Sequence, residues 1–86
     1  MFVVRMCSDA SRETWLKGEK AFWLKWEDEC DVTEVCWWRC ISKKYQAEIF
    51  ETRKEAEEAL ASFSVRYRNS WYGGVEQVEV KDGEIV

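Results

Sequence analysis

The sequence contains no histidine and no proline, and only four of its 86 residues are glycine. Histidine is the side chain that most often moves protons near neutral pH, so its absence removes the commonest general acid or base. No pattern typical of a catalytic triad and no glycine-rich phosphate loop takes its place. We therefore expect a protein that is not an enzyme and that uses no cofactor.

Repeats, low-complexity stretches and composition changes that would mark a domain boundary are also missing from the sequence. A chain of this length is at the small end of what folds alone. Hydrophobic residues make up 47% and aromatic residues 15% of the chain, enough for a compact core despite 35% charged residues. We expect one α+β domain covering residues 1–86.

Long apolar runs are absent as well: none approaches the roughly 20 residues needed to cross a bilayer. Residues 1–7 lack a basic region followed by an apolar one, so we expect no signal peptide and a cytoplasmic location. The net charge of −4 disfavours nucleic acid and anionic membranes as partners, and it favours a protein partner with a basic surface.

The strongest local pattern predicts a helix from about residue 53 to 66. Thr52 stands three residues before Glu55, the spacing of a capping box in which the Thr hydroxyl accepts from the Glu backbone N–H. Apolar residues then recur at helical spacing, which places them on one face that we expect to pack on a sheet: Ala56, Ala59, Leu60, Phe63 and Tyr67.

Strands are predicted on both sides of this helix, over residues 2–7, 21–26, 35–42, 45–50 and 75–80. The dipeptide Asp82-Gly83 predicts a tight turn that folds the last residues back onto Val80. Residues 12–20 fit either one helical turn or a hairpin turn, and we favour the hairpin turn. The fold class is therefore α+β, with an antiparallel sheet of about four to six strands and one main helix packed on one face.

The junction between the last strand before the helix and the helix itself has a recognisable pattern, A-x-x-F-x-T-x-x-E-A. In this chain its positions are Ala47, Phe50, Thr52, Glu55 and Ala56. The junction resembles that of small, mostly uncharacterised α+β proteins of phages and prophages. The resemblance implies an inhibitor that acts on host defence proteins or sequesters their messengers.

Tryptophan is unusually frequent, with six residues in 86. Trp23 and Trp26 lie three positions apart on one predicted strand, and Trp37 and Trp38 are adjacent on another, so each pair points to opposite faces. At least two rings then leave the face covered by the helix. Loops, a second copy of the chain, a ligand or a foreign protein could cover them. We favour a partner protein as the binding target, because Trp is over-represented among binding hot spots.

Carboxylates are concentrated in residues 27–34, where five acidic residues occur in eight positions. This segment could be a solvated turn that protects a sheet edge, a weak cation site, or a hook for a basic partner. We include four of these acidic residues with the tryptophans in the predicted partner-binding site: Glu27, Asp28, Glu29 and Asp31.

An alternative site would bind a small ligand such as a nucleotide by stacking and phosphate contacts. Its residues would be Trp38, Arg39, Arg66, Tyr67 and Arg68. A third alternative is a homo-oligomer in which the tryptophans are buried between copies.

The four cysteines, Cys7, Cys30, Cys36 and Cys40, lack a C-x-x-C spacing, and no histidine could complete a metal site. We therefore expect no zinc and mostly reduced, partly buried thiols. Cys30 and Cys36 could face each other across a hairpin and form a disulfide in an oxidising compartment.

Overall fold

The computed structural model covers residues 1–86 and is described here except for residues 10, 20, 28–36 and 68–70; the side chains of residues 37 and 64–67 are also excluded. Along the chain follow the elements β1 (Phe2–Cys7), α1 (Arg12–Lys17), β2 (Ala21–Glu27), β3 (Trp37–Ile41), the 3₁₀ helix η1 (Lys44–Gln46), α2 (Arg53–Tyr67), β4 (Tyr72–Gln77), β5 (Val80–Lys81) and β6 (Glu84–Ile85).

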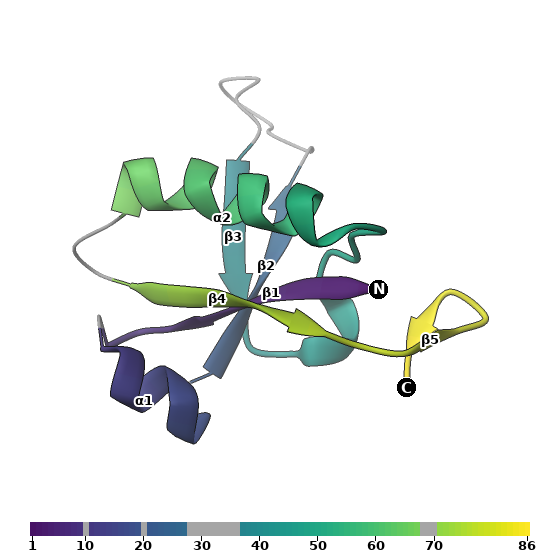
Figure 1. Ribbon diagram of the computed structural model, residues 1–86, viewed down its shortest axis with the longest axis horizontal. Coiled ribbons are helices and arrows are strands. Elements are labelled where there is room, and N and C mark those ends of the chain that lie inside the picture. Colours follow the sequence, from purple (N-terminus) through teal and green to yellow (C-terminus); the bar gives the residue numbers. More distant parts are fainter. Residues whose placement is uncertain (10, 20, 28–36, 68–70) are drawn as a thin grey trace.

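The main sheet has four antiparallel strands in the order β3-β2-β1-β4, and β5 pairs with β6 in a separate two-stranded sheet. The long helix α2 lies on one face of the main sheet and the short helix α1 on the other (Figure 1). Two layers of unequal size thus cover the sheet. The predicted α+β class, strand number and single main helix are confirmed.

Helix α2 begins where the capping pattern predicts. The Glu55 backbone N–H donates to the Thr52 hydroxyl at 3.2 Å, which satisfies one of the free donors of the first turn. Ala56, Ala59 and Phe63 are buried, as the apolar spacing predicts. This face packs on Val4, Met6 and Leu24 of the sheet.

Residues 12–20 correct the sequence prediction, because they begin with a helix and not with a hairpin turn. The Ser11 hydroxyl accepts from the Thr14 backbone N–H and caps α1. Gly18 ends the helix in the left-handed conformation, with φ at 75°, which a glycine adopts at little cost. Lys17 is thus the last residue of α1, and Gly18 is its C-cap before β2 begins at Ala21.

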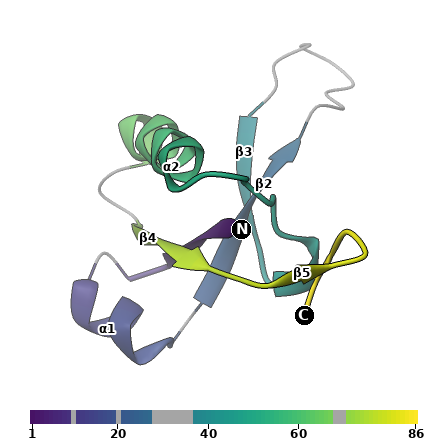
Figure 2. The ribbon, with the colours of Figure 1, turned by 45° about the vertical axis from the view of Figure 1, so that its right-hand side comes forward.

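Residues 45–50 also differ from the predicted strand. The segment contains η1, and only Phe50 forms a β-bridge, exchanging two backbone hydrogen bonds with Phe2. Two residues earlier, the Glu48 N–H donates to the Leu24 carbonyl at 2.9 Å. The segment therefore runs between β1 and β2 and bonds to both, because these strands diverge after a short paired stretch (Figure 2).

Strand β4 begins earlier than the predicted strand over 75–80, includes Gly73 and Gly74, and ends at Gln77, so that Val80 belongs to β5. A Cβ at Gly73 would strike Met6 and Leu60, and one at Gly74 would lie 2.6 Å from the Trp15 ring. Both glycines are thus required by the helices packed on either side of the strand. After β4 the chain makes the predicted tight turn at Asp82 and Gly83, and the pairing of Val80 with Ile85 is confirmed.

The contact of Gly74 with Trp15 gives a test of this packing. We expect Gly74→Ala to destabilise the protein by about 1–3 kcal/mol, the usual cost of overpacking a filled space. Urea unfolding of the variant and of the wild type measures the difference. In a Trp15→Ala background the same glycine substitution should cost less than half as much. An equal cost in both backgrounds would show that the indole is not what excludes the methyl group.

Candidate functional site

The outer part of β2 and β3 forms a two-stranded extension, which we name the β2–β3 arm and define as residues 24–27 and 37–40. The register of β1 with β2 covers only Ala21 to Trp23, whereas β2 pairs with β3 from Trp23 to Glu27. In Figures 1 and 2 the arm runs away from β1 and β4 at a steep angle. At the inner end of the arm Leu24 is fully buried, whereas Trp26 farther out is exposed.

Two indoles meet on the face of the arm that α2 approaches. Trp26 and Trp38 are paired across the strands, and their rings lie 4.8 Å apart in an edge-to-face arrangement with an interplanar angle of 67°. Trp38 also contacts Phe50, 5.7 Å away between ring centroids, and is half-buried. Trp26 is the outer member of this row, and 39% of its surface is exposed.

The backbone N–H of Trp26 bonds to a side chain from outside β2 and β3. Its N–H donates to Oε1 of Glu48 at 3.2 Å. Glu48 is itself fixed by its own N–H, which donates to the Leu24 carbonyl. Sequence reasoning did not select Glu48, and its only signal is its place in the segment that precedes Phe50.

The opposite face of the arm carries an ion pair among its described side chains. Arg39 lies across from Lys25 and forms a 3.4 Å ion pair with Glu27. Nearer the centre of the sheet, Trp23 packs on the cluster of Val3, Ala47 and Val78. Trp23 and Trp26 thus lie on opposite faces, as the sequence predicts, and only Trp26 is exposed.

Several predicted partner-binding residues lie outside the described part of the chain. These are Asp28, Glu29 and Asp31, together with the side chain of Trp37. Glu27 is described and is half-buried in its ion pair with Arg39. Of the predicted partner-binding residues that are described, Trp26 is the one that offers an exposed apolar surface.

The residues of the alternative ligand site do not all come together. Adjacent strand residues point to opposite faces, so Trp38 lies on the helix side with Trp26, and Arg39 lies on the other side with Glu27. One ligand cannot stack on Trp38 and pair with Arg39 without crossing the strand. The side chains of Arg66 and Tyr67, and Arg68 as a whole, are outside the description.

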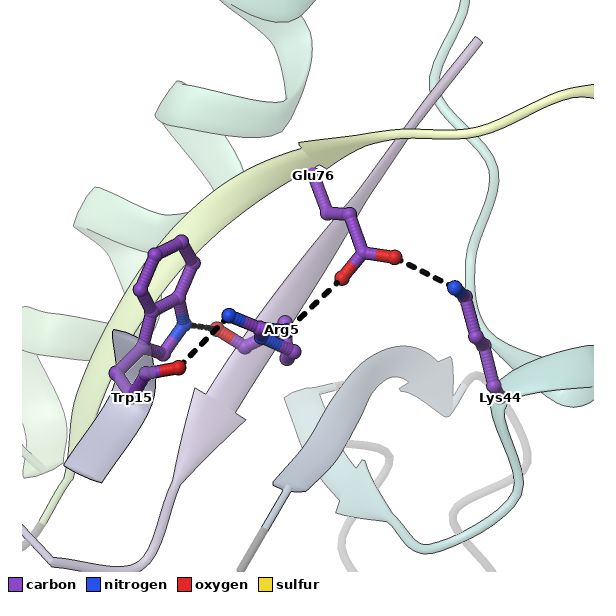
Figure 3. Close-up of polar contacts among 4 residues, drawn as sticks. All are labelled: Arg5, Trp15, Lys44 and Glu76. Carbon is purple, nitrogen blue, oxygen red and sulfur yellow. Dashed lines mark hydrogen bonds and ion pairs between the residues drawn. The ribbon is translucent and has the colours of Figure 1, made fainter. Parts of the chain in front are cut away.

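A polar network fixes the other side of the main sheet (Figure 3). The Trp15 indole N–H donates to the Arg5 carbonyl at 2.9 Å, while Arg5 Nη2 donates to the Trp15 carbonyl at 2.7 Å. Glu76 pairs with Arg5 at 3.5 Å and with Lys44 at 2.5 Å. These contacts link β1, β4, α1 and η1, although the buried Nε of Arg5 has no hydrogen-bond partner. We assign the network the role of binding α1 and η1 to the sheet.

Two of the cysteines are described, and both are free thiols. Cys7 is buried and donates to the Asp9 carbonyl at 2.9 Å. Cys40 lies beneath α2, and desolvation by burial raises the pKa of its thiol to about 12. Cys30 and Cys36 lie outside the described residues, and so does their predicted pairing.

The described residues contain no group of three or more His, Cys, Asp or Glu side chains placed to hold a metal ion. In the same part of the chain, no helix has the length and apolar character needed to span a membrane. Comparison of the chain with protein-family models, with curated proteins and with solved structures gives no match. The chemistry of the site is therefore the basis of the functional inference.

The raised pKa of Cys40 predicts low reactivity. Because the thiolate is the reactive form, a pKa of about 12 leaves only about one Cys40 in ten thousand ionised at pH 8. We expect iodoacetamide at pH 8 to leave Cys40 unmodified in the folded protein and to alkylate it in guanidinium chloride. Peptide mass spectrometry measures both. Rapid alkylation of Cys40 in the folded protein would contradict the desolvated environment beneath α2.

Proposed function

We propose that this protein is a non-enzymatic binding domain that occupies a surface of a partner protein and contacts it through Trp26 on the β2–β3 arm. The supporting observation is that Trp26 keeps 39% of its surface exposed although it packs edge-to-face on Trp38. A large aromatic surface left on a projecting strand pair is typical of an interaction site. Binding would remove that surface from water.

The fixed position of Trp26 adds to its suitability as a contact residue. One side of the indole rests on Trp38, and the backbone is hydrogen-bonded to Glu48. A side chain that is already ordered loses little conformational entropy when a partner covers it. Trp is also the residue type most enriched among binding hot spots.

The net charge of −4 favours a partner with a basic surface. A domain without catalytic groups acts on such a partner by covering it, and inhibition of the partner is the direct consequence. In this proposal the protein is an inhibitor, in keeping with the phage proteins that the junction at Phe50 and Thr52 resembles.

Capture experiments with matched variants test the proposal. Immobilised wild-type protein, Trp26→Ala and Leu16→Ala would be incubated with lysate of the source cells, and bound proteins would be quantified by mass spectrometry. Leu16 is a suitable control because it is apolar, 58% exposed and on α1, on the other side of the sheet. We expect Trp26→Ala to capture at least tenfold less of one protein than the wild type does, since truncating a hot-spot Trp typically costs about 2 kcal/mol or more of binding free energy. Leu16→Ala should retain that protein.

Other outcomes would contradict the proposal. Equal capture by Trp26→Ala and the wild type would show that Trp26 is not the contact. A dimer in native mass spectrometry that Trp26→Ala dissociates would assign the indole to self-association. Quenching of tryptophan fluorescence by nucleotides, lost in Trp38→Ala, would support a ligand-binding domain. Circular dichroism of each variant checks that the fold is retained.

A further inference from the structure

Glu48 has a carboxylate with one free oxygen at the backbone of the exposed Trp26. Its Oε1 accepts from the Trp26 N–H, and its backbone N–H is engaged with Leu24. In the part of the chain that the structure describes, no ion pair or second hydrogen bond involves this carboxylate. Oε2 therefore remains able to accept a hydrogen bond from an external donor.

The protein already uses guanidinium groups to cover aromatic rings. Arg5 lies 4.2 Å from the centroid of Trp15, and Arg53 lies 5.2 Å from that of Phe2. Among the described residues no cation lies over Trp26. The cations of the arm, Lys25 and Arg39, lie on its opposite face, and Arg39 is paired with Glu27.

We propose that Trp26 and Glu48 together bind an arginine side chain of the partner protein. The guanidinium stacks on the exposed indole and donates to the free carboxylate oxygen of Glu48. Arginine fits this pair better than lysine, because its planar group can stack and donate hydrogen bonds at the same time. The site rests on the proposed function and names the chemistry of the partner at its contact point.

Charge alone does not select this position. Exposed carboxylates also lie on the outer side of α2, for example Glu57 and Glu58. Each has a basic residue four positions earlier on the same helix face, Arg53 for Glu57 and Lys54 for Glu58. Glu48 differs because its carboxylate bonds to the backbone N–H of a residue with an exposed aromatic ring, and its own N–H is held by β2. The combination of a fixed carboxylate and an open indole is what would prefer arginine.

Peptide titration followed by NMR of the ¹⁵N-labelled protein tests the site. The probe is a short peptide that alternates arginine with glycine and serine, and a second peptide carries lysine in place of arginine. Glu48→Gln removes the charge but keeps an oxygen that accepts from the Trp26 N–H. Trp26→Leu keeps apolar bulk but removes the aromatic face. Glu57→Gln changes the net charge as Glu48→Gln does, at an exposed site on α2.

We expect the arginine peptide to shift the Trp26 indole N–H signal and the Glu48 amide signal, and to bind more tightly than the lysine peptide. Glu48→Gln and Trp26→Leu should each weaken binding by about threefold to tenfold, the range of exposed charge pairs and cation–π contacts. Glu57→Gln should leave the dissociation constant unchanged within a factor of two. The dispersion of each variant's spectrum reports whether it is folded.

Two kinds of result would overturn the site. Equal weakening of peptide binding by Glu57→Gln and Glu48→Gln would show that only net charge attracts the peptide. Stacking would be excluded if Trp26→Leu bound the peptide as tightly as the wild type, or if the peptide did not shift the Trp26 signal of the wild type. Either result, combined with loss of a captured protein in Trp26→Ala, would reject arginine recognition while leaving the proposed function intact. If Trp26→Ala lost no captured protein, and Glu48→Gln and Trp26→Leu did not weaken peptide binding, both the arginine site and the proposed function would be rejected.

Discussion

The divergence of β1 and β2 is the constraint on which the rest of the structure depends. After Trp23 the two strands no longer bond to each other, yet the backbone groups of the next β2 residues still need partners. The segment before α2 supplies them: Glu48 bonds to Leu24 and Trp26, and Phe50 bonds to Phe2. The same segment leads directly into α2 and thereby links the start of the helix to both strands.

The exposure of Trp26 follows from this arrangement. Phe22, Leu24 and Trp26 share one face of β2, but only Leu24 lies fully under α2. Trp26 is farther out on the arm, where Trp38 and not the helix supports it. An indole needs a large buried surface to be fully covered. At this position it has one aromatic neighbour among the described residues and keeps 39% of its surface exposed.

Local patterns predict much of this fold, and long-range pairing explains what they miss. Thr52 and Glu55 are close in sequence and interact directly, so the helix start was predictable, as was the turn at Asp82 and Gly83. Residues 45–50 were predicted as a strand, but their partners come from two strands that diverge, which no local pattern contains. Alternation correctly separates Trp23 from Trp26. Which of the two is exposed depends on long-range packing, since the cluster of Val3, Ala47 and Val78 covers Trp23 on the face opposite α2. The only sequence signal for Glu48 is its place in the segment before Phe50.

The two faces of the arm restrict how a partner can approach. On one face Arg39, Glu27 and Lys25 are present at close range, and Arg39 already neutralises Glu27. A charged partner group gains little there, because it must compete with an ion pair in water. On the side of Trp26 the Glu48 carboxylate is not ion-paired within the described residues, and it bonds to the backbone N–H of that residue. A cation that is partly desolvated against Trp26 gains more from that carboxylate than it would at an open surface, since the local dielectric constant is lower. The approach that gains most free energy is therefore from the helix side of the arm.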